Sequence, residues 1–300
     1  MNHTKRGLTP YLFISPYLLL YFAFSLFPIL FTFVISLTDW QGTLPRHFIG
    51  LGNYAAMLTD KRVFLSLGNT LTFMLMIIPI QLVTATAIAA FLSMPMMKLV
   101  KTFRLVNFLP YLVTPISMGI IFAIIFSWNG GVLNNLLLAL GIVKKPIFWL
   151  GNPLTAKIVV ALITIWKYTG YTAVLLIAGM TTINQEVIQA SVVDGANERQ
   201  KFFFITLPLL KPVLTFVVIT TMIGCFQIFD EPLLLFSSTQ SLTFVGGPQS
   251  SCLSVVWLLY DTAFSNFVRF GYGSSIAVAM FLIIAVISFT TMKLMNWRNQ

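Results

Sequence analysis

The sequence predicts an all-α, polytopic membrane protein with six transmembrane helices and a polar loop between the fourth and the fifth. Of its 300 residues, 58% are hydrophobic and 9% are charged, whereas charged residues make up about 25% of a typical soluble domain. The apolar residues stand in long runs, and a helix needs about 20 such residues to cross the hydrocarbon core. The net charge of +10 therefore indicates basic membrane loops and no nucleic-acid surface.

The first predicted span covers residues 11–37. Lys5 and Arg6 precede it as in a secretory signal, but its apolar run is too long for a signal peptide and no small-residue cleavage site follows. We therefore expect it to be retained as an anchor. The other predicted spans of this single transmembrane domain, residues 1–300, cover 67–92, 105–128, 154–180, 209–229 and 273–295. Prolines inside them are tolerated because neighbouring helices can satisfy the freed backbone groups.

The basic residues predict which side of the membrane each loop faces, because six spans place both termini on the same side. The loops on the side of the termini hold Lys5, Arg6, Lys98, Lys101, Arg104, Arg199, Lys201, Lys211, Lys293 and Arg298. The opposite loops hold fewer, namely Arg46, Lys61, Arg62, Lys144, Lys145 and Arg269. Since Lys and Arg are enriched in cytoplasmic loops, we expect both termini and the loop 184–208 in the cytoplasm.

The longest outer loop, 230–272, contains the turn sequence Gly246-Gly247-Pro248. After this turn, apolar residues recur at helical spacing, at Leu253, Val256, Trp257, Tyr260, Phe264 and Phe267. The spacing predicts an amphipathic helix. It lies either along the outer membrane surface or against the protein itself.

The polar loop 184–208 is expected to form two short helices joined by a tight turn. Asn184 can cap a helix over 185–193, and Gly195 can take the left-handed conformation that ends it. Asn197 can then cap the second helix, with Gln200 three residues on as in a capping box. Aromatic residues on a cytoplasmic surface usually need a partner that covers them, so this loop is expected to dock on another protein.

The segment EVIQASVVDGANERQKFFFITLPLLKP, which begins at Glu186, resembles the signature loop of permease subunits in binding-protein-dependent ABC importers. The matching residues are Ala190, Asp194, Gly195, Ala196, Ile205, Leu207 and Pro208. Gln189 stands where the family usually has Glu, and Ser191 stands where it often has a second Ala. The resemblance covers nearly the whole chain.

Other segments resemble the carbohydrate branch of that family, in particular the first permease subunit of the maltose and glycerol-3-phosphate importers. They are Phe229-Asp230-Glu231, Gly246-Gly247-Pro248 and Thr262-Ala263-Phe264, while Trp166-Lys167 with Gly170-Tyr171 is similar to the family's fourth core span. The resemblance implies a heteromeric importer of a sugar or oligosaccharide in the cell (inner) membrane of a prokaryote.

The resemblance also implies roles for the loop. It would be the coupling helix that docks on a cytoplasmic ATPase, through Gln189, Ala190, Asp194, Gly195, Ala196, Asn197, Phe203 and Pro208. The family's Glu is thought to pair with a basic residue of the ATPase; Gln189 keeps the hydrogen-bonding capacity and loses the charge.

The chain contains no G-x-x-x-x-G-K-[ST] phosphate loop, so we expect it to bind no cofactor and to be no enzyme. The ATP-Mg would sit on a partner ATPase. The implied partners are a second permease subunit in a heterodimer, an ATPase dimer, an extracellular solute-binding protein and the lipid bilayer.

Candidate solute contacts lie in the fourth and fifth spans. Sugars are commonly bound by aromatic faces beside hydrogen-bonding groups, and these spans offer Trp166, Tyr168, Tyr171, Thr220, Gly224 and Gln227. By resemblance, Tyr171, Thr220 and Gly224 fall near the places where the maltose-type subunit binds its sugar. For each of these the alternative is that the side chain only packs or bonds its own helix. Lys167 is the ionisable residue near mid-depth of a span, where such a residue is a functional candidate by default, and its expected partner is Asp230 or Glu231. Asn69, Gln81 and Asn107 are expected as helix–helix contacts.

Other function classes fit the sequence less well. An ion-coupled secondary transporter usually places carboxylates inside its spans, and the acidic residues here are expected in loops or at span ends. A membrane enzyme is not supported, because the two histidines lie in no metal-ligand or nucleophile constellation. A channel stays open as an alternative, as does glycerol-3-phosphate as the solute.

Overall fold

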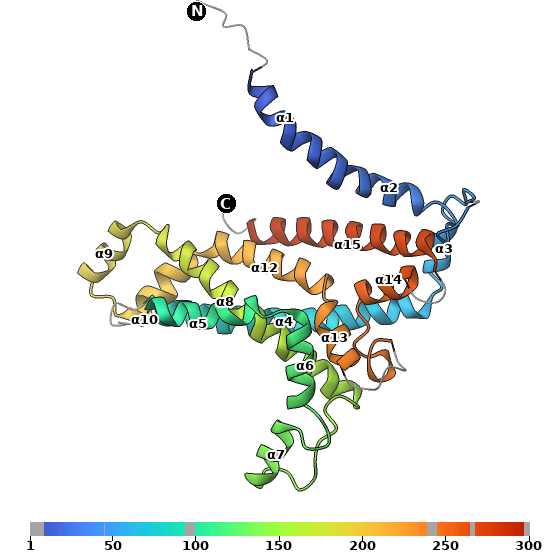
Figure 1. Ribbon diagram of the computed structural model, residues 1–300. Helices are drawn as coiled ribbons and strands as arrows, with labels where there is room; N and C mark the ends of the chain where they lie inside the picture. The colour runs from blue at the N-terminus through green and yellow to red at the C-terminus, as the bar shows by residue number, and fades with distance from the viewer. Residues whose placement is uncertain (1–8, 45, 94–99, 239–244, 265–267, 297–300) are drawn as a thin grey trace, which may run out of the picture. The chain divides into compact units, whose positions relative to one another are not determined.

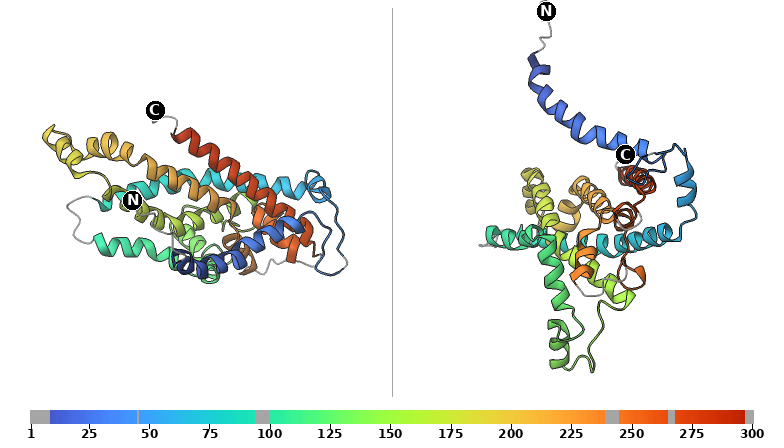
Figure 2. Two further views of the ribbon diagram at one scale, coloured as in Figure 1. Left: turned by 90° about the horizontal axis from the view of Figure 1, so that it is seen from above. Right: turned by 45° about the vertical axis from the view of Figure 1, so that its right-hand side comes forward.

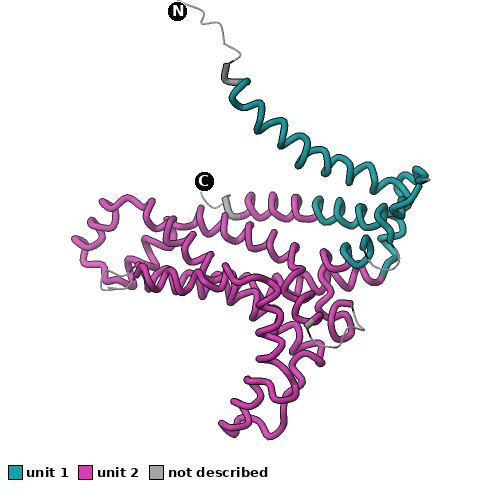
Figure 3. The backbone as a smooth tube through the Cα atoms, in the orientation of Figure 1, with its two compact units in different colours: residues 1–60, 259–282 teal, residues 61–258, 283–300 magenta. Residues whose placement is uncertain are grey.

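The computed structural model describes residues 9–44, 46–93, 100–238, 245–264 and 268–296. Within these ranges the chain is helical, and its β-structure is limited to an isolated bridge between Thr38 and Phe48 (Figure 1). This confirms the all-α fold class. The chain divides into two compact units, residues 1–60 with 259–282 and residues 61–258 with 283–300 (Figure 3).

The first unit begins with a nearly continuous apolar helix. α1 (Thr9–Tyr21) runs through a π-helical turn (Phe22–Leu26) into α2 (Phe27–Ile35). The turn after α2 is held by α3 (Gly52–Met57), whose buried Asn53 donates from Nδ2 to the carbonyls of Ser36 and Thr38, at 2.9 and 2.8 Å. The start of α15 (Phe270–Asn296) joins this corner, because the Gly271 amide donates to the Trp40 carbonyl at 2.9 Å.

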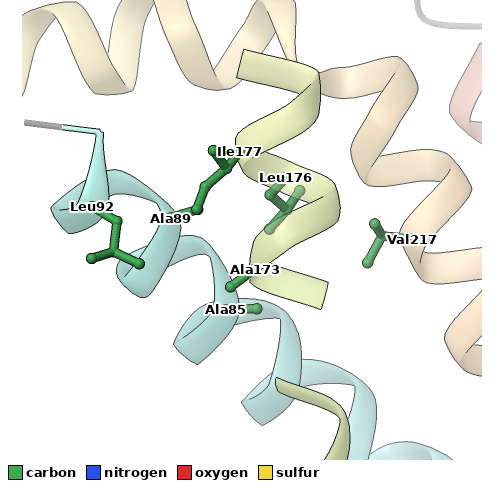
Figure 4. Close-up of a cluster of buried hydrophobic side chains, with 7 residues drawn as sticks. All are labelled: Ala85, Ala89, Leu92, Ala173, Leu176, Ile177 and Val217. Atoms are coloured by element: carbon green, nitrogen blue, oxygen red, sulfur yellow. The ribbon is translucent and has the colours of Figure 1, made fainter. Parts of the chain in front are cut away.

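The second unit is a helical bundle. α4 (Lys61–Leu92), α8 (Pro153–Thr181) and α12 (Lys211–Phe226) run side by side (Figures 1 and 2). Their contact is closed by small and branched side chains, namely Ala85, Ala89, Leu92, Ala173, Leu176, Ile177 and Val217 (Figure 4). Small residues let helices approach closely within a membrane.

Two glycines bring further helices of this unit into close contact. α5 (Val100–Leu112) presses on α8, because a Cβ at Gly170 would overlap the carbonyl oxygen of Asn107. α6 (Pro115–Ile125) packs equally closely on α13 (Asp230–Ser238), where a Cβ at Gly119 would lie 2.8 Å from the Leu234 carbonyl. Beyond α6, the short α7 (Val132–Ala139) extends away from the α4, α8 and α12 bundle (Figure 1).

The described residues include five helical segments that are long and apolar enough to cross a membrane: Tyr11–Ile35, Lys61–Leu92, Pro153–Thr181, Lys211–Ser237 and Phe270–Leu294. The predicted span 105–128 is formed by α5 and α6, which meet at an angle of 93°. The bend has a local cause: Thr114 is extended and caps α6, and Pro115 occupies the first turn of that helix. The count of six therefore holds only if this bent pair is taken as one span.

The segment after the fifth span differs from its expected form at one place and agrees with it at another. Residues 230–238, assigned to the outer loop from sequence, form α13 within the apolar segment Lys211–Ser237. The expected amphipathic helix exists as α14 (Val255–Phe264), and it packs on the protein, because Trp257 is buried and stacks on Phe236. Phe267 lies outside the described residues.

Candidate functional site

A cavity of about 370 Å³ lies within the second unit, between α4, α5, α8, α12 and α13. It is enclosed by aromatic, apolar and polar side chains and contains an ionisable carboxylate. The lining residues are Ile77, Gln81, Tyr111, Thr164, Tyr168, Tyr171, Thr172, Leu175, Val217, Thr220, Thr221, Gly224, Cys225, Gln227, Ile228 and Glu231. An apolar pocket with a few convergent polar groups is the usual form of a small-molecule site.

Three tyrosines form one wall of the cavity. Tyr111, at the end of α5, stacks on Tyr171 of α8 with 4.8 Å between ring centroids. The same ring meets Tyr168 edge-on at 5.8 Å. The rings offer a flat apolar surface whose hydroxyl groups can donate and accept hydrogen bonds.

Five of the residues singled out from sequence line this cavity: Tyr168, Tyr171, Thr220, Gly224 and Gln227. The hydroxyl of Thr220 also donates to the Phe216 carbonyl of its own helix at 2.9 Å. Trp166 lies elsewhere, with its ring edge-on to Phe122 at 5.3 Å. The cavity thus joins the predicted residues of α8 with those of α12, although the two helices are separate in sequence.

Sequence reasoning missed several lining residues. Tyr111 was not identified, because its place at the tyrosine wall depends on the packing of α5 against α8. Gln81 does make the expected helix–helix contact, donating to the Thr172 hydroxyl at 2.8 Å, and both residues also line the cavity. Asn69 donates to the Ser250 and Leu253 carbonyls at 2.9 and 3.1 Å.

The side chain of Asn107 does not make the expected helix–helix contact. Its side-chain amide donates to the Phe103 carbonyl of its own helix at 2.8 Å. The contact with α8 is made by its backbone, which faces Gly170.

Lys167 pairs with Glu231, one of its two expected partners. The Lys167 Nζ lies 2.8 Å from Glu231 Oε1, and each residue is only 7% exposed. Sequence reasoning placed Glu231 at a span end; the structure places it in the first turn of α13, inside the apolar segment Lys211–Ser237. Glu231 therefore does not avoid the spans as the other carboxylates are predicted to do, and it has a cation as its partner.

The polar loop 184–208 has the backbone that its sequence predicts. Asn184 caps α9 (Gln185–Val193) by accepting from the Glu186 amide at 2.9 Å. Gly195 follows with φ of +81°, the left-handed region that favours glycine. Asn197 and Gln200 then form a complete capping box at the start of α10 (Glu198–Gln200).

After α10, a π-helical segment (Lys201–Thr206) leads into α11 (Leu207–Leu209). Pro208 lacks an amide hydrogen, so it cannot donate to the carbonyl four residues before it, and the Leu207 amide bonds Phe202 in the wider π pattern. Phe203 and Phe204 are exposed, the latter at 77%.

Most residues named for docking share one property: they are exposed. Gln189, Ala190, Asp194, Gly195, Asn197, Phe203 and Pro208 are exposed, and Ala196 is half-buried. Val193, which was not named, is 87% exposed beside the turn. The loop therefore presents an apolar and polar surface that the described part of the chain leaves uncovered.

No protein-family model matches the chain, but similar proteins do. It is 34% identical to the lactose transport system permease protein LacF of Rhizobium radiobacter, over 93% of this chain and 91% of that protein. It is 32% identical to the arabinooligosaccharides transport system permease protein AraP of Bacillus subtilis, over 97% and 90%. It is 30% identical to the trehalose/maltose transport system permease protein MalF of Thermococcus litoralis, over 95% and 92%.

Solved structures share the fold. A chain in the crystal structure of a bacterial ABC transporter involved in the import of the acidic polysaccharide alginate matches with a TM-score of 0.82, over 99% of this chain and 98% of that one. A chain of the bacterial alginate transporter in complex with alginate pentasaccharide-bound periplasmic protein matches with a TM-score of 0.80. At 17% identity, these matches establish the architecture alone.

Proposed function

The chain belongs to the permease proteins of carbohydrate ABC transport systems, and on that premise we propose that it moves a sugar or oligosaccharide inward through alternating access driven by a separate ATPase. The observation that carries the proposal is the cavity of α4, α5, α8, α12 and α13. Its tyrosine wall and its Thr, Gln and Glu side chains suit a sugar, which has apolar ring faces and hydroxyl edges.

The interruption of the fifth span supports a solute path at this cavity. α12 ends at Phe226 and α13 begins at Asp230. Gln227 and Ile228, between the two helices, line the cavity. Non-helical backbone at membrane depth is tolerated where it is buried in protein or lines a water-filled space, and transporters often bind solute at such broken helices.

The loop 184–208 is proposed as the docking site for the ATPase. Its capped helices and left-handed Gly195 form a short rigid element, and its uncovered apolar residues would be buried by a partner. Gln189 would contribute a hydrogen bond and no ion pair. ATP can change the conformation of the permease only by favouring one of its states over the other, and a rigid loop would transmit that preference to the spans.

The proposed assembly has four kinds of subunit: this chain, a second permease, an ATPase dimer and an extracellular solute-binding protein. Both termini and the docking loop would face the cytoplasm, in agreement with the basic loops. The similar alginate transporter, which has been solved in complex with a periplasmic protein, agrees with a binding-protein-dependent system.

Affinity purification of the full-length tagged chain from mild detergent tests the assembly. We expect a second permease and a soluble ATPase to co-purify, and sugar-loaded binding protein to stimulate ATP hydrolysis. A tagged chain that purifies without any ATPase and still transports sugar in vesicles would contradict the proposal and favour a secondary transporter.

A further inference from the structure

Lys167 and Glu231 form an ion pair, and either charge alone would be strongly unfavourable in the membrane interior. Its two atoms lie 2.8 Å apart and both side chains are almost completely buried. Removing two charges from water costs several kcal/mol per ion, and ionisable residues inside spans usually mark a solute or ion path. A pair in this position needs a functional explanation.

The two residues of the pair differ in their access to the cavity. Glu231 lines it, together with Gln227 and Ile228 of the helix break. Lys167 is not among the lining residues; its Nζ lies 2.8 Å from Glu231 Oε1 and 5.0 Å from the ring centroid of Tyr168. A solute in the cavity would therefore meet the carboxylate and not the ammonium group.

The carboxylate has capacity for further hydrogen bonds. An ionised carboxylate offers about four lone-pair sites on two oxygens, and Lys167 contacts Oε1. Among the described residues that line the cavity there is no lysine or arginine. A hydroxyl group could donate to Glu231 in a charge-assisted bond, whereas an anionic solute would meet a carboxylate without an accessible cation.

From this arrangement, and resting on the proposed function, we infer that Glu231 is a solute-binding residue that selects uncharged sugars, with Lys167 as the buried counter-ion that holds the carboxylate in place. Glu231 accepts hydrogen bonds from sugar hydroxyls at the helix break and repels uronates and sugar phosphates, glycerol-3-phosphate included.

The test is ligand binding to the purified complex of the two permeases with the ATPase, without the solute-binding protein, because that protein selects solutes upstream. Isothermal titration calorimetry compares neutral disaccharides (lactose, maltose, trehalose and arabinobiose) with digalacturonate. We expect the wild-type complex to bind at least one neutral disaccharide and not digalacturonate.

Three variants isolate the carboxylate. Glu231→Gln should lower the affinity for the best-bound neutral sugar about tenfold or more, because a charge-assisted hydrogen bond is lost. It should also allow digalacturonate to bind, because the charge of Lys167 is left uncompensated. The double variant Lys167→Met with Glu231→Leu should lower the affinity for the neutral sugar and should not bind digalacturonate. Asp230→Asn, an exposed carboxylate outside the cavity lining, should change neither.

A merely structural pair gives a different pattern. If Glu231→Gln folds, inserts and binds the neutral sugar as the wild type does, or if the wild-type complex binds digalacturonate, the inference is overturned while ATP-driven sugar transport can still stand.

If only the double variant assembles, a loss of its affinity for the neutral sugar supports the inference and an unchanged affinity overturns it. A wild-type complex that binds no neutral disaccharide also overturns it, and co-purification of the ATPase then judges the proposed function separately.

Discussion

Gly195 is the residue on which the geometry of the docking loop depends most directly. Its φ is +81°, and a Cβ placed there would meet no atom within 4 Å. A substitution therefore acts through the backbone and not through a clash. A β-branched residue pays about 1–2 kcal/mol in this conformation, whereas Asn tolerates it.

Two substitutions at this position separate backbone conformation from side-chain size. We expect Gly195→Val to reduce ATP-driven transport by roughly fivefold or more, with the spans still inserted, and Gly195→Asn to retain most of it. The measurement is sugar uptake normalised to the amount of permease in the membrane. Normal transport by the Val variant would contradict the docking role of this turn.

Cys252 gives a residue-scale prediction from burial. The side chain is completely buried, and this burial raises the pKa of its thiol to about 12. Because the thiolate is the reactive species, the native protein should not be alkylated there at pH 8. Cys225 is also buried and free.

Mass spectrometry after treatment with N-ethylmaleimide checks this. We expect no modified cysteine in the native protein and two after denaturation, since the chain has two cysteines. Val193→Cys, at a position that is 87% exposed, is the positive control and should react within the native protein. Native labelling of Cys252 at the rate of this control would show that the segment before α14 is open.

Among the elements, the segment around α7 depends on one buried amide. Asn134 donates from Nδ2 to the carbonyls of Ser127, Trp128 and Ile147, at 3.1, 3.4 and 3.0 Å. Its Oδ1 accepts from the Ile147 amide and the Trp149 indole, each at 3.0 Å. A single side chain thus joins both ends of the segment that surrounds α7.

Asn134→Ala should loosen this element, because each buried group left without a partner costs about 1–3 kcal/mol. Limited proteolysis of the segment around α7 should become severalfold faster, while the core of α4 and α8 stays intact. The matched control is Asn135→Ala, whose side chain is exposed and donates only to the Gly130 carbonyl at 3.2 Å. Equal proteolysis of both variants would refute the role of Asn134.

These elements differ in how far the sequence could predict them. The capped helices around Gly195 follow from local rules, because the caps, the turn glycine and Pro208 act within a few residues. The 93° bend of α5 and α6 and the place of Tyr111 at the cavity depend on packing between distant helices. Asn134 has no sequence signal, since its four partner residues are brought together only by the folded segment.

At the scale of the whole molecule, the sequence predicted the fold class and the two separate groups of candidate residues on α8 and α12. It could not predict the cavity that unites them, because this requires α5 and the broken fifth span to pack against α8. The buried position of Glu231 was missed for the same reason: Asp230 beside it is also charged, and only the helix α13 carries Glu231 into the apolar segment.

The family relation leaves one central claim to measure, namely that a separate ATPase drives sugar through this chain. The direct measurement is uptake of labelled sugar into vesicles that contain both permeases, the ATPase and the binding protein, with and without hydrolysable ATP. We predict that accumulation requires ATP on the side of the 184–208 loop and falls strongly with Gly195→Val. Accumulation that persists without ATP hydrolysis would contradict the claim.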